Sequence, residues 1–404
     1  MTFVFPSING TVKPRERSGH VAVHHDGYLV VWGGYCNGDP EQFPGLQFLV
    51  DRYHPSNEVW LYCIETSAWK HVETSGDIPP PMSGSTACVI GGKYMYIFAG
   101  HHDEGPSSTV FVLDLNKFVW QNLTEKIEGN PPSDRDKLCC WTHNDLIVYF
   151  GGYGIPPDPR KVDESCGFFT FNTSVEDQFT DIRGWNSHMF VLDTERLTWS
   201  QPQTKGRAPT PRAAQAAAKL GNIAYIFGGR YMEQRRNDLH AFDMDSMEWS
   251  GSIPTTGKVP DGRTWHSLSA VSDKHLFLYG GFNNQGEALG DAYTLDTSTM
   301  IWFQLSVPSI QSKPMTRMWH TACCTTSPGE VLIFGGCATS VLILEQEHCD
   351  SILIFRFTPQ PLNLLCADTV VKCYSTLQKQ LRSLPKNLLM SLFLHRRLQA
   401  SGKI

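Results

Sequence analysis

This 404-residue sequence lacks the features of several common protein classes. Charged residues make up only 18%, and the net charge of −6 is spread without long runs of either sign, so the clustered basic face of a nucleic-acid-binding protein is not expected. No apolar run reaches the roughly 18 residues of a membrane-spanning helix, so no membrane partner is expected. The opening MTFVFPSING has neither the basic region nor the long apolar run of a signal peptide.

The cysteines lack the usual spacing of a metal site. The chain has 12, including the adjacent pairs Cys139–Cys140 and Cys323–Cys324, but no CxxC occurs, so zinc-ribbon spacing is absent. We therefore expect mostly buried free thiols in a reducing compartment.

Turn-forming residues are abundant, with 34 glycines and 25 prolines, and a hydrophobic fraction of 41% is enough for a substantial core. This balance favours many short strands and tight turns over long helices. The length allows two or three ordinary domains, or one large all-β domain with an appendage.

Six apolar runs end in a pair of small residues, which indicates an internal repeat. They are VVWGGY (30–35), YIFAGH (96–101), VYFGGY (148–153), YIFGGR (225–230), FLYGGF (277–282) and LIFGGC (332–337). Strand-like elements precede and follow each pair, and five of the following elements close on Trp69, Trp120, Trp199, Trp249 and Trp302. Each unit therefore has the length and pattern of a four-stranded propeller blade.

The doubled glycines, the spaced aromatic residue and the tryptophan resemble the kelch repeat. This resemblance predicts an all-β, six-bladed kelch β-propeller over residues 1–358 with a short helical tail over 359–404. We expect each tryptophan to pack between neighbouring blades. The last unit lacks its fourth strand, and we predict that TFVF at 2–5 supplies it and closes the ring.

Positions that differ in one or two units are free to bind a ligand, because positions that serve the fold should look alike. The residues after the small pair are Tyr35, His101, Tyr153, Arg230, Phe282 and Cys337. Only Arg230 is permanently charged, and Arg235 follows closely. We expect this position to lie near the mouth of the central channel; a solvated loop arginine is the alternative.

The strand before the small pair offers a second comparison. We align its second position as Ser18, Ser83, Lys137, Ala213, Thr264 and Met318. The third position is aligned as Gly19, Gly84, Leu138, Ala214, Trp265 and Trp319. Thr264 and Trp265 lie in the unit that follows Arg230 and Arg235, so these four residues are predicted to share one pocket.

Two further features of the repeats are open to more than one interpretation. His20, His266 and His320 share a fourth position and could bind zinc. No carboxylates accompany them, so local hydrogen bonding is favoured and no metal or cofactor is expected. The long insert at about 154–184 ends near Arg183 and Trp185, which could wall the same cleft or belong to an ordinary surface loop.

Two arginines beside a hydroxyl and an indole suit a planar anion, because a guanidinium pairs with a carboxylate through two parallel hydrogen bonds. A free peptide C-terminus is one candidate ligand. Phosphate, sulfate or an acidic side chain would fit the same electrostatics.

After residue 358 the repeats stop and apolar residues follow at helical spacing. A helix is predicted over 361–375, and a second short helix is predicted to begin near Pro385. Leu362, Cys366 and Val370 resemble an elongin-binding box, and Leu384, Pro385 and Leu388 resemble a cullin-2 box. A helical cap packed against the propeller is the alternative.

The two boxes behind a propeller resemble the kelch-repeat substrate receptors of cullin-2 RING ubiquitin ligases. RERSGH, RGWN, RNDLH and GRTWHSL extend the likeness to the group of kelch domain-containing proteins 1 and 2. This resemblance implies a non-catalytic receptor of nucleus and cytoplasm that binds elongin B/C, cullin-2 and its RING subunit, and substrates ending in glycine. A kelch scaffold without ligase recruitment and a metal-dependent propeller enzyme are the alternatives.

The same resemblance assigns roles to individual residues. Arg230, Arg235 and Thr264 would hold the terminal carboxylate, with Thr264 standing where the family pattern has serine. The remaining pocket residues would be Lys137, Tyr153, Arg183, Trp185 and Trp265.

Overall fold

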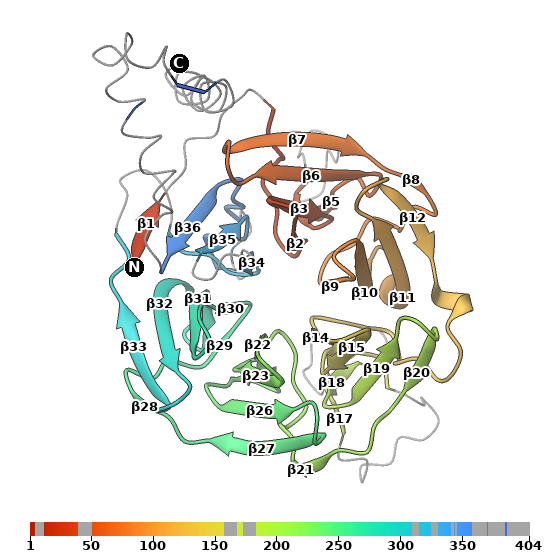
Figure 1. The fold of residues 1–404 in the computed structure, drawn as a ribbon. Helices are drawn as coiled ribbons and strands as arrows, with labels where there is room; N and C mark the ends of the chain where they lie inside the picture. The colour runs from red at the N-terminus through yellow and green to blue at the C-terminus, as the bar shows by residue number, and fades with distance from the viewer. Residues whose placement is uncertain are drawn as a thin grey trace.

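The computed structural model describes residues 1–4, 12–38, 51–156, 168–172, 183–308, 315–324, 330–340, 343 and 346–357, and the single positions 370, 384 and 385. Apart from the 3-10 turn η2 (Thr124–Lys126), every element bounded within these ranges is a β-strand. Six antiparallel blades stand around a central axis in the described part of the chain (Figure 1). The predicted six-bladed, all-β propeller is therefore confirmed.

Each blade has four strands, which are named in order from the innermost to the outermost. Blades I to III consist of β2 (Val21–His25), β3 (Tyr28–Trp32), β6 (Glu58–Cys63) and β7 (Ala68–Glu73); β9 (Thr86–Ile90), β10 (Tyr94–His102), β11 (Gly105–Asp114) and β12 (Val119–Asn122); and β14 (Cys139–His143), β15 (Leu146–Phe150), β19 (Met189–Asp193) and β20 (Thr198–Ser200). Blades IV to VI consist of β22 (Ala216–Leu220), β23 (Ile223–Phe227), β26 (Leu239–Asp243) and β27 (Glu248–Ile253); β30 (Ser267–Ala270), β31 (His275–Asn283), β32 (Ala288–Asp296) and β33 (Ile301–Leu305); and β34 (Thr321–Cys324), β35 (Glu330–Phe334), β36 (Ile352–Arg356) and β1 (Thr2–Val4).

Short additional strands decorate the blades. Three run parallel to outer strands, namely β8 (Ser75–Gly76) on β12, β21 (Lys205–Arg207) on β27 and β28 (Thr256–Gly257) on β33. Others extend the inner strands: β4 (Tyr35–Asn37), β5 (Asp51–Tyr53), β13 (Arg135–Asp136), β16 (Tyr153–Gly154), β17 (Phe169–Phe171), β18 (Gly184–Asn186), β24 (Arg230–Tyr231), β25 (Gln234–Arg235) and β29 (Arg263–Thr264).

The N-terminal strand closes the propeller, as predicted. Strand β1 pairs antiparallel with β36, with Phe3 opposite Phe355, so blade VI combines both ends of the propeller sequence. The predicted helical tail, 359–404, lies outside the described residues except for three isolated positions.

A ring of six backbone hydrogen bonds surrounds the axis. In each blade the N–H of one residue donates to the carbonyl of the equivalent residue in the preceding blade. The donor–acceptor pairs are Gly84–Gly19 (2.8 Å), Lys137–Gly84 (2.8 Å), Ala214–Lys137 (2.8 Å), Trp265–Ala214 (3.0 Å), Trp319–Trp265 (2.9 Å) and Gly19–Trp319 (2.9 Å). We call these six residues the collar; all have left-handed backbone, with φ between 53° and 69°.

The collar corrects our alignment of the third unit. Lys137 occupies the third position and Leu138 the fourth, so the second position belongs to Asp136, which the alignment missed. The bridge from Asp136 to Tyr153 matches the bridge from Ser18 to Tyr35 in blade I. The error came from beginning the unit at Asp136, whereas Arg135 corresponds to the buried Arg17, Arg212, Arg263 and Arg317, and to Met82 in blade II.

The repeated tryptophans pack between blades, which confirms that prediction. Each contacts the aromatic residue just before the small pair of the preceding blade, where aromatic packing adds roughly 0.5–1.5 kcal/mol beyond simple area burial. The ring centroid distances are 4.9 Å for Trp69–Phe334, 5.5 Å for Trp120–Trp32, 5.3 Å for Trp199–Phe98, 5.0 Å for Trp249–Phe150 and 5.2 Å for Trp302–Phe227.

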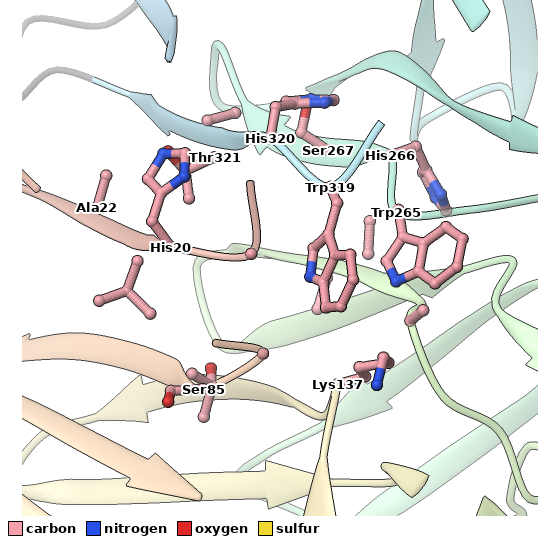
Figure 2. A pocket seen from close by; sticks show the side chains of 18 of the residues that line it. His20, Ala22, Ser85, Lys137, Trp265, His266, Ser267, Trp319, His320 and Thr321 are labelled. Carbon is pink, nitrogen blue, oxygen red and sulfur yellow. The ribbon is translucent and has the colours of Figure 1, made fainter. Parts of the chain in front are cut away.

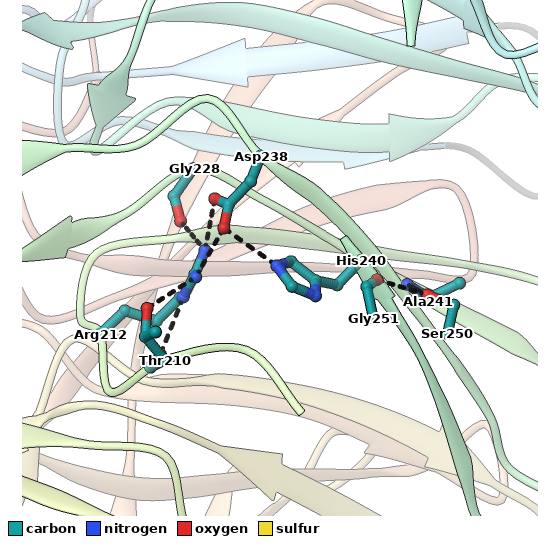
Figure 3. Close-up of polar contacts among 8 residues, drawn as sticks. All are labelled: Thr210, Arg212, Gly228, Asp238, His240, Ala241, Ser250 and Gly251. Carbon is teal, nitrogen blue, oxygen red and sulfur yellow. Dashed lines mark hydrogen bonds and ion pairs between the residues drawn. The ribbon is translucent and has the colours of Figure 1, made fainter. Parts of the chain in front are cut away.

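Buried arginines fix the inner segments of the blades. In blade IV, Arg212 Nη1 donates to Gly228 O (2.9 Å), and the guanidinium forms two hydrogen bonds with Asp238, of 2.7 and 2.8 Å (Figure 3). Blade V repeats the arrangement with Arg263 and Asp291. These bidentate pairs are the strong form of charge-assisted hydrogen bond, and they tie each inner segment to the third strand of its blade.

The cysteines that the structure describes are all free thiols, and half of them are buried. Among the described residues, no helix has the length and apolar character needed to cross a membrane.

Candidate functional site

The second-position residues face the residues that follow the small pair, and these partners surround one end of the channel. Asp136 bridges to Tyr153, Ala213 to Arg230, and Thr264 lies opposite Phe282. Glycine is required beside them because a Cβ on Gly281 would lie only 2.7 Å from the carbonyl oxygen of Thr264. The doubled glycines therefore allow the close backbone approach from which the mouth residues project.

Arg230 and Arg235 lie opposite each other on the hairpin formed by β24 and β25. Arg230 Nε donates to Met232 O (2.7 Å), and its Nη2 lies 3.5 Å from the carboxylate of Glu233, which is itself 76% exposed. The Arg230 guanidinium carbon lies 5.7 Å from the Trp185 ring centroid. This arginine keeps 38% of its side chain exposed and so retains room for a further anion.

Arg235 is half-buried and firmly placed. Its guanidinium carbon lies 4.5 Å from the ring centroid of Phe282, while its backbone N–H and carbonyl are both bonded to the side chain of Asn284. Its Nε has no hydrogen-bond partner among the described residues. Burial lowers the pKa of Arg235, and the nearby positive charge of Arg230 lowers it further. An anion placed between the two arginines would raise the pKa of Arg235 again, because a nearby opposite charge favours the charged guanidinium.

Thr264 and Trp265 present further polar atoms without partners. Thr264 is only 2% exposed, and neither its Oγ1 nor Trp265 Nε1 has a hydrogen-bond partner in the described ranges. The Trp265 ring stacks on Trp319 with a centroid distance of 5.2 Å and an interplanar angle of 18°.

Lys137, Tyr153 and Arg183 line one cavity of about 240 Å³ at the mouth. Trp319 also lines it, together with Tyr35, Tyr53, Ser83, His101, Pro106 and Asp136. Lys137 and Trp319 belong to opposite blades of the collar, and the Lys137 ammonium lies 5.2 Å from the Trp319 ring centroid. The collar glycine of blade I makes room for the Trp319 ring, because a Cβ on Gly19 would lie only 3.1 Å from Trp319 Cε2.

The other predicted pocket residues lie beside this cavity rather than on its walls. Tyr153 connects to them through Trp185, whose ring centroid is 5.3 Å from that of Tyr153 and which in turn contacts Arg230. On the other side, Trp319 connects the cavity to Trp265. The predicted residues thus form a continuous band around the mouth.

His101 has a defined tautomer in this cavity. Its Nε2 accepts from Arg183 Nη1 (3.4 Å), so Nδ1 carries the proton and donates to Tyr53 Oη (3.0 Å). Burial is the main cause of its lowered pKa, and the charges of Lys137 and Arg183 add to it. His101 is therefore neutral near pH 7.

The three histidines considered for zinc lie between blades. His20 Nε2 bonds to Thr321 (2.8 Å) and His320 Nε2 to Ser267 (2.9 Å), while the rings of His20 and His266 contact Phe334 and Phe227. Figure 2 shows the three around one pocket, with His266 next to Trp265 and His20 on the opposite side. In the described ranges no group of three or more His, Cys, Asp or Glu residues could hold a metal ion.

The residues of the two tail boxes are not placed by the structure. Leu362, Cys366 and Leu388 fall outside the described residues, and Val370, Leu384 and Pro385 are described only as isolated positions. Both boxes remain predictions.

Comparison with known proteins identifies clear relatives. The model of the KLHDC2/KLHL20/DRC7 Kelch-repeats domain matches residues 1–152, 49–281 and 216–360. Kelch domain-containing protein 2 of Homo sapiens is 42% identical over 383 residues, covering 94% of this chain and 90% of the relative. Kelch domain-containing protein 1 of Mus musculus is 39% identical over 383 residues, covering 93% and 88%.

A solved structure supports the fold alone. The protein described as "Structure of YjhT" superposes with a TM-score of 0.60 at 15% identity, covering 86% of this chain and 97% of that one.

Proposed function

Because the chain belongs to the family of the KLHDC2/KLHL20/DRC7 Kelch-repeats domain, we propose that it is the substrate-recognition subunit of a cullin-2 RING ubiquitin ligase. In this role it binds the C-terminal carboxylate of proteins that end in glycine and presents them for ubiquitination. It performs no catalysis itself and works in the nucleus and cytoplasm.

The observation that carries this proposal is the pairing of Arg230 and Arg235 across β24 and β25, with only the exposed Glu233 near Arg230 as a carboxylate partner in the described residues. Two guanidinium groups on one face match the two oxygens of a terminal carboxylate. The Thr264 hydroxyl, in the adjacent blade, has no hydrogen-bond partner among the residues that the structure describes and is available as another donor.

A terminal glycine fits the aromatic character of this part of the mouth. Trp185, Trp265 and Phe282 are buried or half-buried around the arginines. A ligand side chain pressed against these rings would cause overpacking, which typically costs about 1–3 kcal/mol. Glycine avoids that cost because it lacks a Cβ.

Titration with two peptides that differ only at their ends tests the carboxylate role. A peptide ending in Gly-Gly with a free acid should bind, whereas its C-terminal amide should bind far more weakly, because the amide brings no charge to the arginines. Fluorescence anisotropy on the purified protein measures both affinities. Equal binding of acid and amide would refute the proposal.

Ligase recruitment needs a separate test through the tail. Co-purification with elongin B/C should be lost in the double variant Leu362→Ala and Cys366→Ala, while Gly-Gly peptide binding is retained. Unchanged elongin association would show that the tail assignment is wrong without affecting the carboxylate site.

A further inference from the structure

Asp136 is the one acidic residue among the six second-position residues at the mouth. The others are Ser18, Ser83, Ala213, Thr264 and Met318. Its side chain is only 3% exposed, and it lines the mouth cavity together with Lys137 and Arg183. Neither the sequence alignment nor the proposed carboxylate site gives it a role.

The two oxygens of Asp136 have different surroundings. Oδ2 forms an ion pair with Lys137 Nζ, whereas Oδ1 is buried without a hydrogen-bond partner among the described residues. A buried acceptor left unpaired costs roughly 1–3 kcal/mol, and more when it is charged. Buried polar groups in native proteins normally have partners, so this atom indicates a partner supplied by a ligand or by solvent.

Lys137 supplies a complementary donor next to this acceptor. Its ammonium has three N–H donors, and 22% of the side chain is exposed, so the pair with Asp136 leaves capacity for another oxygen. Figure 2 shows the Lys137 side chain below the indoles of Trp265 and Trp319. An acceptor and a donor are thus adjacent at the wall of one cavity.

The charges of the cavity favour a neutral ligand group there. Lys137 and Arg183 are cationic, Asp136 is anionic and His101 is neutral, so an extra ammonium or guanidinium would meet an excess of positive charge. An ionised carboxylate has no proton to donate to Asp136 Oδ1, so it cannot satisfy this acceptor. An amide group carries no net charge and offers both an N–H and a carbonyl.

We infer that Asp136 and Lys137 bind an amide group of the ligand polypeptide, with Oδ1 accepting the N–H and Nζ donating to the carbonyl oxygen. This inference rests on the proposed function, because it concerns the residues upstream of the carboxylate that Arg230 and Arg235 bind. Tyr153 and Trp185 connect the two places on the mouth. The amide comes from the main chain or from an Asn or Gln side chain.

An ester scan distinguishes these sources. Each amide of a Gly-Gly peptide without Asn or Gln is replaced in turn by an ester, which removes one N–H while preserving the chain. A main-chain contact predicts that one ester weakens wild-type binding about tenfold or more, and that proline at the same position does so too. A side-chain contact instead predicts that an added Gln at one position strengthens binding about tenfold while every ester is tolerated.

Substitution of Asp136 completes the test. Asp136→Asn should weaken binding about tenfold or more for the peptide that makes the contact, which is the parent peptide for a main-chain amide and the Gln-containing peptide for a side-chain amide. The reason is that the new amide oxygen would remain with Lys137 and the NH₂ would face the ligand N–H. The sensitive ester should then cost this variant nothing further. Asp136→Ser introduces the residue found at this position in blades I and II, and it should weaken binding similarly even if the asparagine variant folds poorly.

The outcomes separate this inference from the proposed function. If both Asp136 variants bind the parent and the Gln-containing peptides like wild type, or if the same ester penalty persists in them, the inference is overturned. Discrimination between acid and amide peptides is measured in parallel on every variant. If wild-type protein binds the acid and amide peptides equally, the carboxylate site is refuted. If it prefers the acid peptide but the Asp136 variants bind like wild type, only the amide contact is refuted.

Discussion

Blades IV and V each contain a buried arginine, whereas both mouth arginines belong to blade IV, and the two kinds differ in their carboxylate partners. Arg212 and Arg263 are fully buried, each bound bidentately to an aspartate and to a glycine carbonyl. Arg230 lies 3.5 Å from one exposed glutamate, and Arg235 is half-buried with an Nε that has no partner in the described part of the chain. The hydrogen-bond donors of arginine are thus occupied by protein groups in the buried set, whereas the mouth arginines keep donors available for a ligand.

This difference separates stability from binding. A buried guanidinium whose donors are already used has nothing to offer a ligand, and its removal would disturb the blade. A mouth arginine with unused donors contributes little to the packing between blades. Substitutions in the buried set should therefore lower the stability of the fold, whereas substitutions of the mouth arginines should lower the affinity for peptide.

The largest effect is expected from Asp238→Asn, which leaves Arg212 buried without its anionic partner. Breaking a buried ion pair in this way typically costs about 3–5 kcal/mol. Urea unfolding should show this loss of stability, while the folded variant should retain affinity for a Gly-Gly peptide. An unchanged unfolding midpoint would contradict the role of the pair.

Blade II provides a natural control for that experiment. It has Met82 where blade IV has Arg212, and Thr109 where blade IV has Asp238. The double change Arg212→Met with Asp238→Thr copies this combination and removes both charges. It should be less destabilising than Asp238→Asn alone, because no buried charge remains unpaired.

The mouth arginines should give the opposite result. Arg235→Ala should weaken binding of the free-acid peptide by about 2–5 kcal/mol, the range for truncating one member of a buried charge pair. Its unfolding midpoint should change little compared with that of Asp238→Asn. Calorimetric titration and urea unfolding of the same preparation check both quantities. A large loss of stability without loss of affinity would place Arg235 with the buried set.

The sequence predicted the fold well because the repeated residues have one structural task each. The small pairs allow close backbone approach, Trp120 and its equivalents fill the gaps between blades, and the unit without a fourth strand required the pairing of β1. Comparison of the units also selected Arg230, since its charge departs from every equivalent residue. These features depend on spacing along the chain, which a sequence displays.

The collar was harder to predict for a physical reason. Left-handed backbone usually marks glycine, yet Lys137, Ala214, Trp265 and Trp319 adopt it because the ring of hydrogen bonds holds them there. The positions of the glycines were therefore not enough to align the units, and the alignment did not place Asp136 at the second position. The contact between Lys137 and Trp319 crosses the axis between opposite blades, and no sequence spacing encodes it.

A smaller effect is expected from pH, because blade III has His188 where blade IV has Asp238. Burial and the charge of Arg135 lower the pKa of His188 to about 4, so the folded protein keeps it neutral. The unfolded chain binds its proton near pH 6.5, and stability should therefore fall as pH drops from about 6.5 to 4, by about 1 kcal/mol per unit from this residue.

His188→Gln should reduce this acid sensitivity. The difference in unfolding midpoint between variant and wild type should be constant above pH 7 and should shift in favour of the variant at lower pH. If the unfolding midpoints of variant and wild type instead differ by the same amount at every pH, His188 does not take up a proton on unfolding.

The smallest effect is expected from Glu233→Gln, which removes the carboxylate near Arg230. Both side chains are exposed, and such pairs contribute about 0–1 kcal/mol, so the unfolding midpoint should hardly move. Peptide affinity should rise by less than tenfold, because the ligand carboxylate no longer competes with Glu233. This gain should shrink at high salt, where screening weakens the competing pair. Weaker binding by the variant would instead assign Glu233 to the positioning of Arg230, and would make even this exposed pair part of the recognition surface.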